Sequence, residues 1–333
     1  MASGKTGTNL LAADFLQLVQ DELQRVEEQI ELQSIASVEA VTAIGHYLQA
    51  GGGKRLRPIL LLLASKLAGD SNDGAVRLGA VVELIHTATL VHDDVIDDAE
   101  TRRGRPSANV LWGNQATVLA GDWLYMQAFN IALRQRDFRI LELLIGLTQT
   151  MVEGELLQLE RLGRIDITEA DYMELVDRKT ARLFSTCATL GALAGRGDDL
   201  TAARLGDYAW NLGMAFQLVD DILDFTAEKS VLGKPVGNDL REGKLTLPLV
   251  YALQGASPQE RALVAMVLED RSYKRASFPA ILELTLRRRG VERARERALA
   301  FTDRAREIIG EFPESPAQRA LATIPDLIIG RDY

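Results

Sequence analysis

Apolar residues recur at three- and four-residue spacing along almost the whole chain, whereas sustained alternation of apolar and polar residues is absent. Spacing of this kind places apolar side chains on one face of an α-helix, while alternation would indicate a strand. The pattern therefore predicts an all-α protein. The expected helices cover about 14–32, 37–49, 58–67, 75–97, 115–135, 138–163, 168–194, 199–225, 247–254, 258–268, 278–289, 291–312 and 317–329.

Glycine, proline and polar residues separate these predicted helices. Gly51-Gly52-Gly53 ends the second one, and Pro58 suits the first turn of the third, where a backbone N–H is not needed. Polar loops are expected at Asp98–Ser107 and Gly233–Lys244. No linker rich in Pro or Ser and no break in composition divides the 333 residues, so we expect a single domain covering 1–333.

Two aspartate-rich clusters follow the same DDxxD pattern. They are Asp93-Asp94-Val95-Ile96-Asp97 and Asp220-Asp221-Ile222-Leu223-Asp224, and each ends an apolar helical stretch. Residues four apart share a helix face, so each cluster brings like charges together and requires a counter-charge. Carboxylate oxygens with room for water are suitable ligands for Mg²⁺, and substrate phosphates usually complete the coordination shell of this ion. One cluster alone would indicate a solvated helix end, but its repetition favours a metal site.

Composition excludes several classes of protein. Hydrophobic residues make up 47% of the chain and charged residues 26%, and the mean hydropathy of −0.02 is typical of a soluble globular protein. The net charge is −9, from 38 basic and 47 acidic residues. Seven acidic residues belong to the two clusters with the adjoining Asp98, which leaves 40 against 38, so the acidity is local. Such a surface argues against binding of nucleic acid or of an anionic membrane.

The chain also lacks signals for export. Cys187 is the only cysteine, so no disulfide can form within the chain, and its apolar surroundings predict a buried, inert thiol. The first residues lack the basic and apolar regions of a signal peptide. The longest uncharged stretch, Pro106–Gly121, is too short and polar to cross a bilayer. We expect a cytoplasmic protein without an integral membrane segment.

Basic residues flank both clusters. Gly51–Gly53 leads into Lys54 and Arg57 just before a helix N-terminus, an arrangement that suits a phosphate, although a flexible loop with solvated charges fits equally well. Arg102-Arg103 follows Asp97 by five residues and could bind phosphate oxygens bidentately or neutralise the carboxylates. A third group consists of Lys179-Thr180, Lys234 and Lys244.

A charge count links metal and phosphate. The seven carboxylates contribute −7, and seven bases return +7: Lys54, Arg57, Arg102, Arg103, Lys179, Lys234 and Lys244. Two diphosphates of about −3 each would then be neutralised by about three Mg²⁺ ions. If all these groups face one cavity, its charge is balanced only when the substrates and metal ions are bound.

Taken in order, these motifs resemble those of the trans-polyprenyl diphosphate synthase family. The matching segments are Gly-Gly-Lys-Arg-Leu-Arg-Pro, His-Asp-Asp-Val-Ile-Asp-Asp with Arg-Arg-Gly, Lys-Thr, Phe-Gln-Leu-Val-Asp-Asp-Ile-Leu-Asp and Gly-Lys-Pro. They run from about residue 50 to 250 and are highly specific together. The chain is similar above all to bacterial long-chain synthases, which make the octaprenyl, nonaprenyl or decaprenyl tail of respiratory quinones such as ubiquinone. The resemblance implies an all-α bundle around a deep central cavity (the isoprenoid synthase type) and a homodimer.

The resemblance also implies roles for individual residues. Asp93, Asp97, Asp220 and Asp224 would be the Mg²⁺ ligands, supported by Asp94 and Asp221. An allylic diphosphate of the farnesyl or geranyl type would be bound by Arg102, Lys179, Lys234, Thr180 and Gln217, and isopentenyl diphosphate by Lys54, Arg57, His86 and Arg103, with Lys244 a further substrate-binding residue. Catalysis would depend on Asp93, Asp97, Arg102, Lys179, Asp220 and Lys234. A lone histidine on an apolar helix is more often a core residue, but the motif favours binding for His86.

The implied reaction is a head-to-tail condensation. Metal ions and cationic side chains stabilise the departing diphosphate, and the isopentenyl double bond attacks the allylic cation. A proton then leaves, in this family to the released diphosphate, and no side-chain base is evident. Ala88 and Thr89, on the turn before Asp93, are too small to block a growing tail and so favour a long product. Phe129 or Met126, on the neighbouring helix, is a candidate for the cavity floor, with an ordinary core role equally compatible.

Other functions fit the motifs less well. A class I terpene cyclase shares the first cluster, but its second metal motif is of the Asn/Ser/Glu type. A head-to-head synthase of the squalene or phytoene kind lacks the Gly-Gly-Lys-Arg-Leu-Arg-Pro loop. A non-catalytic partner subunit would have lost some of the aspartates. A shorter-chain, geranylgeranyl-type synthase remains an alternative, which product analysis would distinguish.

Overall fold

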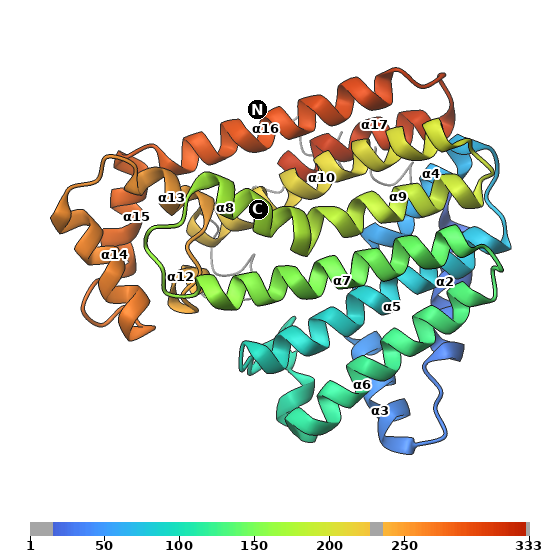
Figure 1. Cartoon of the computed structure of the whole chain (residues 1–333), viewed down its shortest axis with the longest axis horizontal. Helices are drawn as coiled ribbons and strands as arrows, with labels where there is room; N and C mark the ends of the chain where they lie inside the picture. Colours follow the sequence, from blue (N-terminus) through green and yellow to red (C-terminus); the bar gives the residue numbers. More distant parts are fainter. Residues whose placement is uncertain (1–15, 227–235, 331–333) are drawn as a thin grey trace. The chain divides into compact units, whose positions relative to one another are not determined.

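The computed structural model describes residues 16–226 and 236–330, and Figure 1 shows that this part of the chain is almost entirely helical. The expectation of an all-α protein is therefore confirmed. Lys234 and the neighbouring Gly233 and Pro235 lie outside the described residues. The helices are α2 (Gln20–Gln33), α3 (Glu39–Ala50), α4 (Leu56–Ala68), α5 (Asp73–Ile96), α6 (Ala108–Leu133), α7 (Phe138–Arg161), α8 (Glu169–Val176), the π-helical turn η1 (Asp177–Ala181), α9 (Arg182–Ala194), α10 (Asp199–Thr226), α12 (Asn238–Arg241), α13 (Leu247–Leu253), α14 (Pro258–Asp270), α15 (Phe278–Arg287), α16 (Gly290–Gly310) and α17 (Pro316–Ile329).

The chain forms two compact units, each assembled from segments that are distant in sequence. Unit 1 takes in 1–146, 184–207 and 309–323, and unit 2 takes in 147–183, 208–308 and 324–333. The boundary between the units does not fall at a linker, because both units include residues of α7, α9, α10, α16 and α17. The expectation of one domain over 1–333 stays a prediction.

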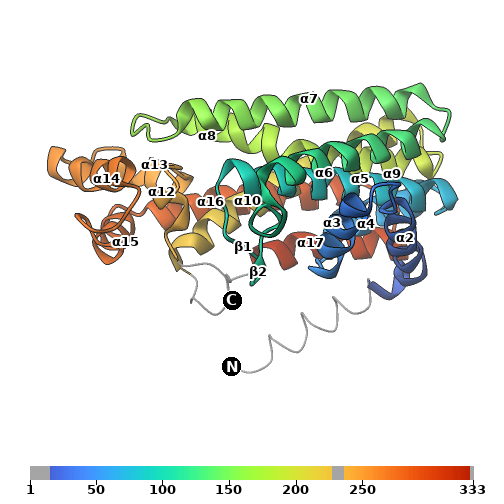
Figure 2. The same ribbon diagram turned by 90° about the horizontal axis from the view of Figure 1, so that it is seen from below.

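The core of unit 1 is built around α5. This helix packs against α2, α4 and α6, and Figures 1 and 2 both show α5 and α6 side by side. The Asn72 side chain caps α5 by accepting hydrogen bonds from the backbone N–H groups of Gly74 and Ala75, at 2.8 and 3.2 Å. Gly191 allows α9 to approach α4, because a Cβ atom there would lie only 2.2 Å from the carbonyl oxygen of Leu61. Cys187 is buried as expected, and burial raises the pKa of its thiol to about 12.

The expected polar loop after α5 contains a short antiparallel hairpin. Its strands are β1 (Thr101–Arg102) and β2 (Arg105–Pro106), seen in Figure 2. The turn residues Arg103 and Gly104 have φ values of 52° and 74°, which a two-residue hairpin turn with the natural strand twist requires. Strands of two residues carry no measurable alternation, and the sequence pattern therefore missed them.

Helix α6 begins at Ala108, earlier than the expected start near residue 115. Gly113, with φ 78° and ψ 159°, is not helical and divides α6 into two helical segments, the second of which begins near the expected start. Glycine adopts this conformation without steric cost. Together with the polar Asn114 and Gln115 it resembles a loop in the sequence, and the pattern therefore missed the short helical segment before Gly113.

Unit 2 contains the elements from the end of α7 to α8 and η1, together with α12–α15. Helix α13 packs against α8 and α15, and α14 packs against α12 and α15 (Figure 1). One continuous helix was expected at 168–194, but the π-helical turn interrupts it at Asp177–Ala181. A π turn widens the helix by one residue and often occurs at functional sites.

Helix α5 is long and apolar enough to cross a membrane by length and composition, and it alone passes this test among the described residues. However, 67% of its most apolar window is buried inside the structure. Buried apolar residues of this kind are typical of the core helix of a globular unit.

Candidate active site

The first aspartate cluster ends α5. The backbone N–H of Asp97 donates to the carbonyl oxygen of Asp93 at 2.8 Å, so helical geometry continues to Asp97 and the two residues lie one turn apart, as predicted. Both are half-buried. Asp94 is buried and accepts hydrogen bonds from Arg102, whose Nε lies 2.7 and 2.8 Å from the two carboxylate oxygens. The hairpin is thereby tied to α5, and the neutralising role considered for Arg102 is present in the structure.

A pocket in unit 1 gathers basic residues around this cluster. Its lining includes Arg55, His86, Asp94, Arg102 and Arg103. The glycine-rich loop closes against the hairpin, since a Cβ atom on Gly53 would lie 3.1 Å from Nη1 of Arg103. The structure therefore brings the first two predicted basic groups together.

Lys54 and Arg57 lie on either side of Arg55, which anchors the glycine-rich loop. Lys54 is exposed, whereas Arg57 is half-buried with its guanidinium 5.3 Å from the centre of the Phe184 ring. Between them, Arg55 has φ 49° and donates from Nη1 to Glu83 at 2.7 Å and from Nη2 to Glu27 at 2.9 Å. Sequence reasoning missed this anchor, because the two glutamates are distant in sequence and carry no motif.

Burial lowers the pKa of His86 well below its usual value, and the positive charges of Arg57, Arg103, Arg102 and Arg55 lower it further. The imidazole is therefore neutral at neutral pH. Burial also lowers the pKa of the Arg103 guanidinium, with Arg102 and Arg55 as additional causes. Cations held this close together repel one another, and an anion in the pocket would relieve that repulsion.

The predicted chain-length residues lie on α5 and α6. Ala88 is fully buried, Thr89 is half-buried with its hydroxyl donating to the carbonyl oxygen of His86 at 2.7 Å, and Phe129 is half-buried on α6. Met126, the alternative for the cavity floor, is instead exposed on α6. The effect of the other three residues on product length stays a prediction.

The second cluster lies near the end of α10, in unit 2. Asp220 is half-buried, and Asp221 is buried with both carboxylate oxygens hydrogen-bonded. The Tyr172 hydroxyl donates to Oδ2 of Asp221 at 2.6 Å, and Nε2 of Gln217 donates to Oδ1 at 2.8 Å. The Thr180 hydroxyl in turn donates to Oε1 of Gln217 at 3.0 Å. Two predicted substrate-binding residues, Thr180 and Gln217, thus join the cluster.

Burial also shifts the pKa values of the hydrogen-bonded pair Asp221 and Tyr172. It raises the pKa of Asp221 well above its usual value, and the negative charge of Asp239 raises it further. The pKa of the Tyr172 hydroxyl is likewise raised, first by burial and then by the charge of Asp221.

Asp224 has a structural partner that the sequence did not indicate. Its carboxylate accepts hydrogen bonds from the backbone N–H groups of Asn238 and Asp239 at 3.1 and 3.3 Å, and its carbonyl oxygen accepts one from Gly237 at 2.8 Å. The carboxylate therefore holds the start of α12 against α10. Its predicted role as a metal ligand remains a prediction.

Lys179 lies in the π-helical turn, where α7 holds it. Its ammonium group donates to Glu155 at 2.5 Å and to Gln158 at 3.2 Å. The preceding Arg178 pairs with Glu153 at 2.6 Å. Gly154, between the two glutamates, allows the turn to approach, since a Cβ atom there would lie 2.9 Å from Cβ of Arg178.

A second pocket lies in unit 2 and includes several predicted site residues. Its lining contains Lys179, Thr180, Gln217, Asp221 and Lys244. The Lys244 ammonium donates to Glu242 at 2.8 Å.

The chemistry of the cluster residues fits a magnesium ion. Carboxylate oxygens are the hard ligands that this ion prefers. Among residues 16–226 and 236–330, no group of three or more His, Cys, Asp or Glu side chains is gathered closely enough to hold a metal ion by itself.

Known proteins resemble this chain over nearly its whole length. The family model described as "Polyprenyl synthetase" matches residues 38–285. The octaprenyl diphosphate synthase of Haemophilus influenzae is 36% identical over 98% of this chain and 99% of its own.

Solved structures agree with this match. A polyprenyl synthase from Caulobacter crescentus, complexed with calcium and isoprenyl diphosphate, has a TM-score of 0.91 and 35% identity, covering 96% of this chain and 98% of its own. A decaprenyl diphosphate synthase from Rhodobacter capsulatus has the same TM-score, identity and coverage.

Proposed function

Because the chain belongs to the polyprenyl synthetase family, we propose that it condenses isopentenyl diphosphate head to tail with an allylic diphosphate, making a long all-trans polyprenyl diphosphate. One observation on the site carries the proposal. Each pocket combines a cluster aspartate with basic side chains, Asp94 with Arg102 and Arg103 in unit 1 and Asp221 with Lys179 and Lys244 in unit 2.

The proposed magnesium-binding residues are Asp93, Asp97, Asp220 and Asp224. They would hold about three ions when the substrate supplies the remaining oxygen ligands. When bound, Mg²⁺ neutralises diphosphate charge and so favours its departure. Support comes from the half-buried carboxylates of Asp93 and Asp97, one turn apart.

The basic residues bind the two diphosphates. Arg102, Lys179 and Lys234 hold the allylic diphosphate, with Thr180 and Gln217 beside them. Lys54, Arg57, His86 and Arg103 hold isopentenyl diphosphate, and Lys244 adds a further cation. The lowered pKa values of His86 and Arg103 support an anion at the isopentenyl diphosphate position, because its negative charge would offset the positive charges of the crowded guanidinium groups.

The product is proposed to be a tail of eight to ten isoprene units for a quinone, made in the cytoplasm. Support comes from the small Ala88 and Thr89 before the first cluster and from the long-chain synthases that the chain resembles.

We also propose that the protein acts as a homodimer. Leu119, Met126 and Leu133 recur every seven residues on α6 and are 65%, 61% and 57% exposed, and Phe138 at the start of α7 is 78% exposed. Side chains at this spacing share a helix face, and an apolar stripe of this kind is typical of an interface. The same stripe on a second copy is its proposed occupant, as in a two-fold symmetric contact.

Purified protein incubated with farnesyl diphosphate, isopentenyl diphosphate and Mg²⁺ tests the activity. We expect dephosphorylated products of eight to ten isoprene units on chromatography, no turnover in EDTA and recovery on addition of excess Mg²⁺. Asp93→Ala and Asp220→Ala should each lower kcat by orders of magnitude and still fold, because each relieves repulsion between carboxylates. Full turnover in EDTA, or a geranylgeranyl product, would contradict the proposal.

A further inference from the structure

Tyr172 is a buried tyrosine of α8 that no motif of the sequence includes. Its side chain is only 4% exposed, as is Asp221, to which its hydroxyl donates at 2.6 Å. Breaking a buried hydrogen bond leaves the remaining polar group without a partner at a cost in free energy, so this contact fixes the direction of the Asp221 side chain.

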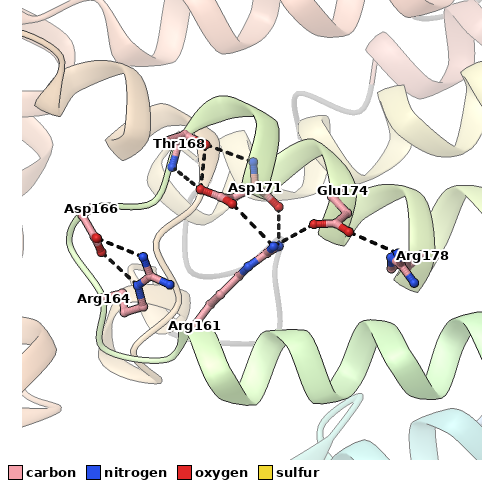
Figure 3. A network of polar contacts seen from close by, with 7 residues as sticks. All are labelled: Arg161, Arg164, Asp166, Thr168, Asp171, Glu174 and Arg178. Carbon is pink, nitrogen blue, oxygen red and sulfur yellow. Dashed lines mark hydrogen bonds and ion pairs between the residues drawn. The ribbon is translucent and has the colours of Figure 1, made fainter.

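The structure holds α8, and with it Tyr172, firmly in place. Figure 3 shows Arg161, at the end of α7, reaching α8 with hydrogen bonds of 2.7 Å to the carbonyl oxygen of Asp171 and 2.7 Å to the Glu174 carboxylate. Thr168 and Asp171 form a capping box at the start of the helix. Glu174 also accepts a hydrogen bond from Arg178 of the π-helical turn at 3.1 Å. Both ends of α8 are therefore anchored around Tyr172.

The hydrogen bond of Tyr172 is one end of a chain that crosses three elements. It runs from Tyr172 on α8 to Asp221 on α10, then through Gln217 to Thr180 in the π-helical turn. Thr180 directly follows Lys179, and Asp221 directly follows Asp220. These hydrogen bonds therefore fix the position of the pair Lys179–Thr180 relative to the pair Asp220–Asp221, all within unit 2.

We propose that Tyr172 is a positioning residue for the allylic half of the site. Its hydroxyl holds Asp221, and through Asp221 it sets the orientation of Asp220 and of the Gln217–Thr180 pair toward a magnesium-bound allylic diphosphate. This inference rests on the proposed function. It assigns to Tyr172 a role that is exerted through Asp221, in a pocket that both residues line.

Tyr172→Phe tests the inference, because it removes the hydroxyl and keeps the ring. The matched control is Tyr208→Phe, a fully buried tyrosine of α10 that lies twelve positions, about 18 Å, before Asp220. Binding of farnesyl thiodiphosphate, an unreactive allylic analogue, is measured by calorimetry with and without Mg²⁺. We expect the Mg²⁺-dependent affinity to fall about tenfold or more in Tyr172→Phe, as for loss of a buried hydrogen bond that leaves its acceptor unsatisfied, and to stay near wild type in Tyr208→Phe.

Steady-state kinetics provide the second measurement. KM for the allylic diphosphate and the Mg²⁺ concentration for half-maximal rate should rise in Tyr172→Phe, while KM for isopentenyl diphosphate should not change. In an Asp221→Asn background the Tyr172 substitution should have little further effect, because the two residues act as one unit.

Several outcomes overturn the inference. They are equal effects of the Tyr172 and Tyr208 substitutions, additive effects of Tyr172→Phe and Asp221→Asn, and an equal rise of KM for both substrates. If Tyr172→Phe does not fold, the binding of farnesyl thiodiphosphate to Asp221→Asn tests the inference instead. An Mg²⁺-dependent affinity equal to that of the wild type in this variant would also overturn the inference. A wild-type protein that fails to incorporate isopentenyl diphosphate would instead refute the proposed function.

Discussion

At the scale of single residues, His86 links the charge of the site to stability. Burial and four nearby arginines hold its pKa in the folded protein below the usual value of 6.5. The unfolded chain therefore takes up a proton first as the pH falls, and the free energy of unfolding decreases as the pH falls below about 6.5.

We expect His86→Gln to remove this contribution. Between about pH 7 and 5, the stability of the wild type should fall more steeply than that of the variant, by at most about 1.4 kcal/mol per pH unit for a single proton. Denaturant titrations of both proteins across this range measure the difference. Parallel curves would show that the imidazole is not held neutral in the folded state.

Ala88 provides a test of product length. Its side chain is fully buried on α5, so a phenylalanine there would overpack the wall and cost about 1–3 kcal/mol. If the growing tail passes this wall, Ala88→Phe should still incorporate isopentenyl units but release mostly products of three to five units. Chromatography of the dephosphorylated products is the measurement.

Ala75→Phe is the matched control, because Ala75 is also fully buried on α5 but lies thirteen positions earlier, about 20 Å along the helix. It should lower stability but leave the long product unchanged, because it lies far from the proposed path of the tail. An unchanged long product from Ala88→Phe would mean that the tail takes another path.

At the scale of elements, the contact between α7 and the π-helical turn positions Lys179. We expect Gly154→Ala to push the turn away, because the new Cβ atom would lie 2.9 Å from Cβ of Arg178 and 3.3 Å from the backbone nitrogen of Lys179. The ion pair between Lys179 and Glu155 would weaken, KM for the allylic diphosphate should rise, and stability should fall by about 1–3 kcal/mol.

The same helix offers a control for this change. Gly146 also lies in α7, but a Cβ atom there would have no neighbour within 4 Å. Gly146→Ala should therefore stabilise the protein by up to about 1 kcal/mol through helix propensity and leave the kinetics unchanged. Thermal unfolding and steady-state kinetics of both variants test the contrast, and equal behaviour would argue against a specific role of the contact.

At the scale of the whole molecule, the apolar stripe on α6 predicts self-association. Met126→Glu places a charge at an exposed position of the stripe, and we expect it to shift the protein from dimer to monomer in analytical ultracentrifugation. Lys274→Glu changes a charge on a segment outside α6 and α7 and should leave the dimer intact. A monomeric wild type would contradict the proposed assembly.

The sequence by itself determined the fold class and the chemistry. Three- and four-residue periodicity predicts helices because each helix must bury one face, and the twice-repeated DDxxD pattern predicts paired carboxylates because helical geometry places residues four apart together. Both features are local in sequence. For the same reason, the hydrogen bond from Asp97 to Asp93 could be anticipated, and so could the burial of Cys187.

Only the tertiary structure decided which residues, distant in sequence, contact the clusters and the loops beside them. The contacts of Arg55 with Glu27 and Glu83, of Tyr172 with Asp221 and of Asp224 with the start of α12 join segments with no common motif. The π-helical turn, the kink at Gly113 and the two-residue strands also depend on packing or on single φ angles rather than on periodicity. Hydrophobic pattern records which face of an element is buried, but the partner of each buried polar group is set by how the elements pack.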